Sequence, residues 1–182
     1  MRARDYLVMN NKNQDTCYQQ AATDYGPDLA RFTAGYERDP ALRRELLQEV
    51  HVALWQSFAS YQAQCSLRTW IYRVAHNVGV THIQRTMRRA ERQSLAIEDI
   101  EAQACEYTDI ALTERRLDLT RVMALIHQLA PLDRQVMLLY LEELDAASIA
   151  EVTGLSARNV ATKVHRIKAV LAAQLSGGMQ HE

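Results

Sequence analysis

Residues 145–168 read D-A-A-S-I-A-E-V-T-G-L-S-A-R-N-V-A-T-K-V-H-R-I-K. The small Ala150 allows two helices to approach closely, Gly154 supplies a turn between them, and Val160 is placed to fix the second helix on the first. This spacing predicts a helix-turn-helix. Helix pairs with a glycine turn are common, so the spacing alone leaves a purely structural pair of helices open.

Charge on the second helix of this pair favours nucleic acid. Asp145 and Ser156 each precede a helical run, where a side-chain oxygen can cap a backbone N–H group. The segment 155–175 contains no Asp or Glu. We therefore predict a helix with one apolar side, around Val160 and Val164, and one cationic side for a DNA groove and its phosphates. The cationic side holds Arg158, Lys163, His165, Arg166 and Lys168.

A second segment without acidic residues runs from residue 66 to residue 90. It interleaves cations with Trp70 and Tyr72, and a base stacked on such a ring stabilises binding by about 1–3 kcal/mol. The combination favours contact with strand-separated DNA as well as duplex. Trp70 by itself is better explained as a core residue. The cations of the segment are Arg68, Arg73, Arg85, Arg88 and Arg89, with His76 and His82.

The composition indicates a globular helical protein. Of 182 residues, 48% are hydrophobic and 24% are charged, which is typical of folded domains and not of disordered or membrane chains. Only three prolines and six glycines interrupt the chain, which favours long helices. We expect an all-α fold in the cytoplasm, without membrane insertion, because no apolar run reaches the length of a membrane span.

Neither metal nor catalytic chemistry is indicated. Cys17, Cys65 and Cys105 lie far apart and lack the spacing of zinc ligands, so we expect no metal, disulfide or cofactor. The histidines do not cluster, and no nucleophile-elbow, P-loop or dinucleotide fingerprint is present. The formal charge of −1 gives no sign of a polyanionic partner, so a DNA-binding interpretation depends on where the charges lie. We predict a binding protein and not an enzyme.

Helical periodicity divides the chain into two small domains on an acidic linker. The polar segment 1–22, interpreted as a mobile tail or a loosely docked helix, precedes a short helix from Pro27 to about Tyr36. Between Glu91 and Asp118 acidic residues dominate, which is typical of an extended connection. Helical stripes predict elements over residues 41–59 and 67–89 before this linker, separated by a loop at 57–66, and over 119–129, 136–140 and 160–171 after it, with a shorter helix between the last two.

Three runs together resemble a bacterial sigma factor of the extracytoplasmic-function type (ECF, group IV of the sigma-70 family). L-L-Q-E-V-H-V-A-L-W at 46–55, S-L-R-T-W-I-Y-R-V-A-H-N at 66–77 and V-H-R-I-K at 164–168 follow the family's order and spacing, over about residues 25–172. The resemblance implies a three- or four-helix bundle called region 2 and a helix-turn-helix called region 4. Its boundaries are 1–22 for a tail, 23–91 for region 2, 92–117 for the linker, 118–175 for region 4 and 176–182 for a second tail.

The resemblance also implies a function. A sigma factor binds core RNA polymerase, at the β′ clamp helices and the β flap, and directs it to specific promoters. Region 2 reads and melts the minus-ten element, and region 4 binds the minus-thirty-five element. The acidic linker would then thread the RNA path of the polymerase. Whether an anti-sigma factor binds this chain stays open.

Three groups of residues match functional positions of the family. Polymerase contacts are implied for Leu47, Gln48, Glu49, Val50, Leu54 and Trp55. Minus-ten contacts are implied for Ser60, Tyr61, Gln62, Ser66, Tyr72, Arg73, His76, Asn77, Arg85, Arg88 and Arg89. Minus-thirty-five contacts are implied for Ser156, Arg158, Asn159, Thr162, Lys163, His165, Arg166 and Lys168.

The chain departs from the family pattern at several positions. Residues 42–45 read L-R-R-E where an acidic cluster is usual, His51 replaces a large apolar residue, and Arg158 replaces a small one. Two alternatives to this function stay open; the region 2 similarity argues against the first, and the reversed charge at 42–45 favours keeping the second. One is a two-domain helix-turn-helix regulator whose first module senses a signal or dimerises, and the other is a sigma-like adaptor that binds polymerase without opening promoters.

Overall fold

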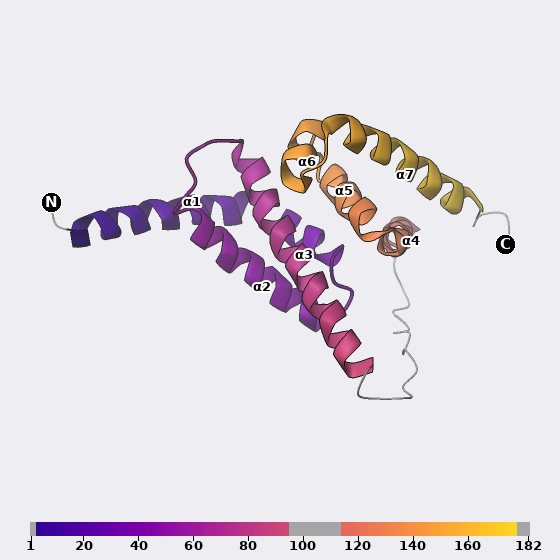
Figure 1. Cartoon of the computed structure of the whole chain (residues 1–182), viewed down its shortest axis with the longest axis horizontal. Coiled ribbons are helices and arrows are strands. Elements are labelled where there is room, and N and C mark those ends of the chain that lie inside the picture. The colour runs from indigo at the N-terminus through magenta and orange to yellow at the C-terminus, as the bar shows by residue number, and fades with distance from the viewer. Residues whose placement is uncertain (1–2, 95–113, 178–182) are drawn as a thin grey trace.

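The residues that the structure describes form seven α-helices and no strand (Figure 1). The computed structural model describes the backbone of residues 3–94 and 114–177 and the side chains of residues 14–89, 92 and 121–175. The all-α prediction is confirmed, and none of the helices in these ranges is long and apolar enough to cross a bilayer. The helices are α1 (Ala3–Ala34), α2 (Pro40–Ser57), α3 (Leu67–Ser94), α4 (Glu114–Gln128), α5 (Pro131–Leu141), α6 (Ala146–Thr153) and α7 (Ala157–Gly177).

Helix α1 is longer than the sequence predicts. We expected a polar segment to residue 22 and a new helix at Pro27, but one helix runs through both. Pro27 lacks an N–H group and therefore removes one helical hydrogen bond, a loss that packing has to offset. Ala21 is buried, and the buried amide of Gln14 donates to the backbone oxygen of Trp55 at 2.6 Å. The polar residues from 14 onward therefore dock α1 on α2 and do not form a tail.

Helices α2 and α3 run side by side and form, with α1, the amino-terminal module (Figure 1). Asp39 caps α2 by accepting from the N–H groups of Ala41 and Leu42 at 2.8 and 2.9 Å, and Pro40 opens the helix as predicted. The predicted loop lies between the end of α2 and the start of α3. The apolar stripe of α2 faces the core through Leu46, Val50 and Leu54.

Helices α4 to α7 form the carboxyl-terminal module. Both α5 and α6 contact α7, which places the two helices of the predicted helix-turn-helix, α6 and α7, against each other. Val160 of α7 is fully buried, and Ala150 of α6 is half-buried against the same core. The periodicity thus predicted both the helices and their inward faces. The largest fully buried side chains of this module are Ile126, Val136, Leu139, Ile149 and Ile167.

The two modules pack against each other and share one continuous hydrophobic core. A Cβ atom at Gly35, where α1 ends, would overlap the side chain of Leu138 in α5, so only glycine allows this approach. Next to it, Nε2 of His127 donates to the backbone oxygen of Ala34 at 3.0 Å. The sequence suggested two independent cores, and the difference arises from contacts between residues about 100 positions apart.

Candidate polymerase and nucleic-acid surfaces

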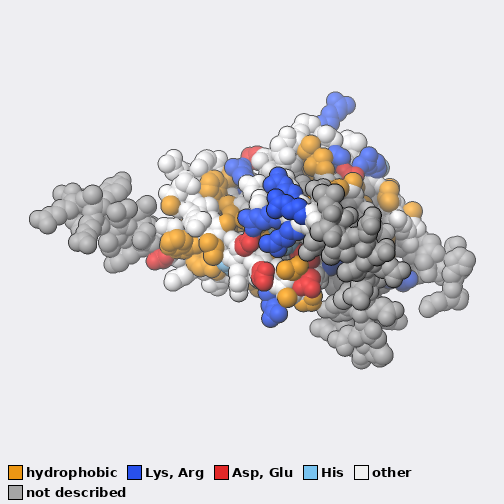
Figure 2. Space-filling view, turned by 60° about the horizontal axis from the view of Figure 1, so that its bottom comes forward, with side chains coloured by type: hydrophobic (Ala, Val, Ile, Leu, Met, Phe, Trp, Pro, Cys, Tyr) orange, Lys and Arg blue, Asp and Glu red, His pale blue; other side chains and the backbone are white. Residues whose placement is uncertain are grey.

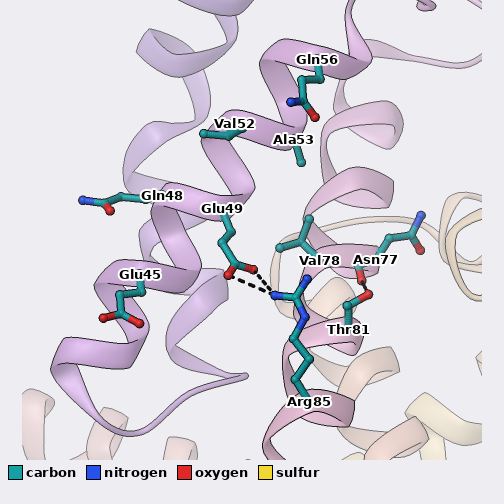
Figure 3. Close-up of a pocket in the computed structure, with 10 residues that line it drawn as sticks. All are labelled: Glu45, Gln48, Glu49, Val52, Ala53, Gln56, Asn77, Val78, Thr81 and Arg85. Atoms are coloured by element: carbon teal, nitrogen blue, oxygen red, sulfur yellow. Dashed lines mark hydrogen bonds and ion pairs between the residues drawn. The ribbon is translucent and has the colours of Figure 1, made fainter.

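A groove of about 660 Å³ lies between α2 and α3 (Figure 3). Glu49 and Arg85 bridge it, because Nη1 of Arg85 donates to both carboxylate oxygens of Glu49 at 3.1 and 3.0 Å. Val52, which is 56% exposed, gives the groove an apolar wall. The lining residues are Glu45, Gln48, Glu49, Val52, Ala53 and Gln56 of α2 and Asn77, Val78, Thr81 and Arg85 of α3.

The residues expected to contact polymerase fall on two sides of α2. Gln48 and Glu49 are exposed at the groove, Leu47 is half-buried, and Trp55 is 36% exposed. Val50 and Leu54 lie on the same helix, but their side chains are buried in the core. They cannot touch a partner in this structure, because the helical period turns every fourth residue inward. The sequence reasoning missed Val52, whose signal was an apolar residue lying off the buried stripe.

The loop between α2 and α3 presents polar side chains on an aromatic base. Ser60, Gln62 and Ser66 are exposed. Tyr61 is half-buried, with its ring centroid 5.3 Å from that of Trp70 and its hydroxyl donating to the backbone oxygen of Cys65 at 3.0 Å. The contact between these tilted rings therefore holds the loop in one shape with its polar residues at the surface, where the hydroxyls of Ser60 and Ser66 bond to Ser57 and Thr69 of the same chain. Trp70 is half-buried in this base, which fits the core interpretation of that residue.

The first half of α3 turns one side toward the carboxyl-terminal module. We call Arg68, Thr69, Tyr72 and Arg73 the α3 stripe. Tyr72, expected at the minus-ten element, is fully buried, and its hydroxyl donates to Oε2 of Glu142 at 2.7 Å. Burial, followed by the bond to Glu142, raises the pKa of this hydroxyl. Arg73, also expected at DNA, pairs with Glu151 of α6 at 2.9 Å. The stripe thus faces the other module, with Thr69 and Tyr72 buried and Arg68 and Arg73 half-buried.

His76 is a core residue and not a surface one. It is 5% exposed, and its Nδ1 lies 3.0 Å from the hydroxyl of Tyr36. Burial lowers the pKa of His76 to about 4, because the charged ring would lose its hydration. Direct contact of His76 with DNA is therefore excluded in this arrangement. Its place after Tyr72 on the inward side of α3 explains the difference from the sequence-based expectation.

The second half of α3 remains accessible. Asn77, Arg85, Arg88 and Arg89 are all exposed. In Figure 2 the lower ends of α2 and α3 are turned toward the viewer. Lys and Arg side chains gather on this face, together with some acidic ones. His82 does not join this surface, because its Nε2 pairs with Glu37 at 2.8 Å and both side chains are largely buried.

The helix-turn-helix is built as the sequence predicts. Asp145 caps α6 by accepting from the N–H of Ser148 at 2.7 Å, a bond that lowers the pKa of Asp145. Gly154 ends α6 with a φ of 76°, in the left-handed region that favours glycine. Ser156 then accepts from the N–H of Asn159 at 3.2 Å and caps α7. Two caps and one glycine therefore fix the angle at which α7 leaves α6.

Helix α7 presents most of its predicted contact residues to solvent. Val160, Val164 and Ile167 are buried. The predicted residues lie on the other sides of the helix, so the division into an apolar and a cationic side is present. Ser156, Arg158, Asn159, Thr162, His165, Arg166 and Lys168 are exposed, and Lys163 is half-buried.

One acidic residue occupies part of the cationic side. Asp133 of α5 pairs with Lys163 at 2.7 Å and with Arg166 at 2.6 Å. Its own side chain is 16% exposed. Arg158 has no ion pair among the residues that the structure describes. Sequence reasoning missed Asp133, because no local spacing links it to residues 30 positions later.

Metal and catalytic centres are not apparent in the described ranges. There, no three His, Cys, Asp or Glu side chains gather as metal ligands. Cys17 is exposed and Cys65 is half-buried, and both are free thiols. The expected acidic linker and Cys105 lie largely or wholly outside the residues that the structure describes.

Comparison with solved structures identifies the fold. The chain is similar to CnrH, solved in complex with the cytosolic domain of CnrY, with a TM-score of 0.66 and 19% identity over 93% of this chain and 94% of that one. It is also similar to the sigma factor RpoE of Bartonella quintana, solved with the anti-sigma factor NepR, with a TM-score of 0.69 and 17% identity over 87% and 96% of the two chains. No curated protein sequence matches the chain.

Comparison with protein families assigns both modules. Residues 21–89, which span the carboxyl-terminal part of α1, all of α2 and most of α3, match Sigma-70 region 2. Residues 119–171, which contain the helix-turn-helix, match Sigma-70 region 4. Both regions are those that the sequence resemblance predicted, in the same order. The chain therefore belongs to the sigma-70 family of transcription initiation factors, a family of DNA-binding proteins that act with RNA polymerase and are not enzymes.

Proposed function

We propose that this chain, as an ECF-type sigma factor, binds core RNA polymerase and directs it to specific promoters. Region 4 would bind the minus-thirty-five element, and region 2 would read and melt the minus-ten element. The observation that carries the proposal is the exposed cationic side of α7 on a capped helix-turn-helix. A helix held in this way can enter the major groove with its cations toward base edges and phosphates.

The groove between α2 and α3 is our candidate for the polymerase contact. It combines an apolar wall at Val52 with exposed Gln48 and Glu49, so it offers both burial and hydrogen bonds to a helical partner. Figure 3 shows Gln48 pointing outward while Glu49 reaches across to Arg85. The Arg43 and Arg44 pair lies in the first turns of the same helix, so a partner there has to accommodate cations.

The loop between α2 and α3 is our candidate for the minus-ten contact. The loop combines exposed polar residues, Ser60, Gln62 and Ser66, with the contacting rings of Tyr61 and Trp70. Polar atoms next to aromatic rings suit the binding of unstacked bases. The exposed Arg88 and Arg89 of α3 would hold the DNA backbone. An anti-sigma factor is a further proposed partner, since the similar RpoE was solved with one.

Reconstituted transcription tests the proposal. The chain is mixed with core polymerase and a library of promoter fragments, and we expect specific initiation that neither component gives alone. Val52→Glu should abolish initiation, because it places a charge on the apolar wall of the groove. Leu132→Glu is the matched control, since Leu132 is an exposed apolar residue of α5, outside both the groove and α7. DNA binding without initiation would favour a helix-turn-helix regulator, and polymerase binding without initiation would favour an adaptor.

A further inference from the structure

Glu142 of region 4 is at the centre of the contacts between the two modules at the α3 stripe. Glu142 lies at the end of α5 and is 7% exposed, which is unusual for a carboxylate and requires partners. It has them in the other module: the hydroxyl of Tyr72 donates to its Oε2 at 2.7 Å, and Arg31 of α1 pairs with the same oxygen at 3.1 Å. Arg68 donates to its backbone oxygen. One residue of region 4 therefore binds three residues of region 2.

Other contacts surround this centre on both sides. The hydroxyl of Thr69 donates to that of Ser148 in α6 at 3.3 Å, and Arg73 pairs with Glu151 one turn later on the same helix. On the other side, Gly35 admits Leu138. The same packing thus buries Thr69 and Tyr72, pairs Arg68 and Arg73 with region 4, and ties α6, the first helix of the helix-turn-helix, to region 2.

We propose that Glu142 is the latch of a closed, self-masked state, in which region 4 covers the first half of α3 and which has to open before promoter DNA can reach that surface. The masking part of this inference rests on the proposed function, because it takes the α3 stripe as a nucleic-acid surface. The latch itself rests only on the contacts of Glu142. Opening would free Arg68, Arg73 and the hydroxyl of Tyr72 at one step.

A disulfide trap measures the closed state in the full chain. The side-chain oxygens of Thr69 and Ser148 lie 3.3 Å apart, so cysteines at these two positions are within reach of a disulfide when the modules are closed. Thr69→Cys and Ser148→Cys are introduced together, in a background in which Cys17, Cys65 and Cys105 are replaced by serine. Oxidised glutathione is added, and the rate of cross-linking is followed by mass spectrometry.

The latch predicts how this rate changes. Glu142→Ala should slow cross-linking by roughly tenfold or more, because it removes hydrogen bonds to a charged group. Arg31→Gln should slow cross-linking less. Unlike Glu142→Ala, this substitution changes an exposed side chain and should leave folding unaffected. Glu143→Gln is the matched control, since it removes the same charge from the exposed neighbour, and should leave the rate unchanged. Equal rates for the double-cysteine chain with and without Glu142→Ala or Arg31→Gln would overturn the latch.

The masking is tested on the same protein. The oxidised, cross-linked chain should fail to initiate transcription with core polymerase, and reduction of the disulfide should restore initiation. Initiation by the oxidised chain would overturn the masking. Failure of the unsubstituted chain, with its native Thr69 and Ser148, to initiate would contradict the proposed function instead, while the cross-linking rates would still decide whether Glu142 holds the modules closed.

Discussion

The first half of α3 and helix α7 carry similar sequence patterns and end in different surroundings. Both segments lack acidic residues and combine cations with an apolar stripe. In α7 the cations stay on the surface, apart from the half-buried Lys163, and Asp133 pairs with Lys163 and Arg166. In α3 they face the other module, where Glu142 and Glu151 bind them. An acid-free amphipathic helix therefore identifies a surface suited to anions without showing whether that surface is free.

The largest expected effect concerns how a histidine of each helix, the buried His76 of α3 and the exposed His165 of α7, affects the stability of the protein in acid. Because burial lowers the pKa of His76 from 6.5 to about 4, the neutral form is favoured in the folded state. The His76 contribution to the free energy of unfolding is therefore fully present above pH 6.5. It is lost as the pH falls toward 4, which lowers the free energy of unfolding by about 3 kcal/mol. His76→Asn should remove most of this dependence in denaturant titrations. Both tryptophans, Trp55 and Trp70, lie in region 2, so their fluorescence reports on the correct module.

A control and a residual effect sharpen this prediction. His165→Asn changes an exposed histidine on α7 and should leave the pH dependence as it is. Burial also lowers the pKa of His51, so the His76→Asn protein keeps a weaker dependence of the same sign. An unchanged acid sensitivity of the variant would show that His76 is not held neutral in the core.

The second prediction compares one arginine from each helix. Arg158→Ala should reduce the slope of log K against log salt concentration by about 0.9 in binding of the full chain to minus-thirty-five duplex, as expected for one lost phosphate contact. Arg73→Ala should leave that slope unchanged, because Arg73 pairs with Glu151 between the modules. The measurement is fluorescence anisotropy over a salt series. Equal changes for both variants would erase the distinction between the helices.

The smallest expected effect concerns Asp133. Asp133→Asn should raise the affinity of the chain for minus-thirty-five duplex by roughly two- to fivefold, since it releases Lys163 and Arg166 from an ion pair whose worth is about 0.3–1 kcal/mol. Asp24→Asn, which alters an exposed acid on α1, serves as the control for net charge. A loss of affinity would mean that Asp133 positions the two cations for DNA and does not compete for them.

Local sequence patterns predicted most of the fold, but they did not predict contacts between residues far apart in the sequence. The caps at Asp145 and Ser156 and the turn at Gly154 act within a few residues, so the sequence displays them directly. The bond between Tyr72 and Glu142 joins residues 70 positions apart, and no periodicity encodes it. The sequence around Glu142 does not distinguish it from its acidic neighbour, the exposed Glu143.

The polymerase surface shows the same limit on one helix. The matching run L-L-Q-E-V-H-V-A-L-W contains both the buried Val50 and Leu54 and the exposed Gln48 and Glu49. A family resemblance marks the run as a whole and does not separate the residues that shape it from those that touch a partner. The helical period makes that separation, and it assigns Val52 to the accessible side.

Hydroxyl-radical footprinting tests most directly whether the first half of α3 is covered in the free chain and uncovered during initiation. Oxidation of Tyr72 is measured by mass spectrometry in the free chain and in its complex with core polymerase before promoter DNA is added, with the half-buried Tyr61 and Tyr140 as internal references. We expect Tyr72 to react far more slowly than the references in the free chain and to gain reactivity in the complex. Tyr72 reacting as fast as Tyr61 in the free chain would contradict the closed arrangement.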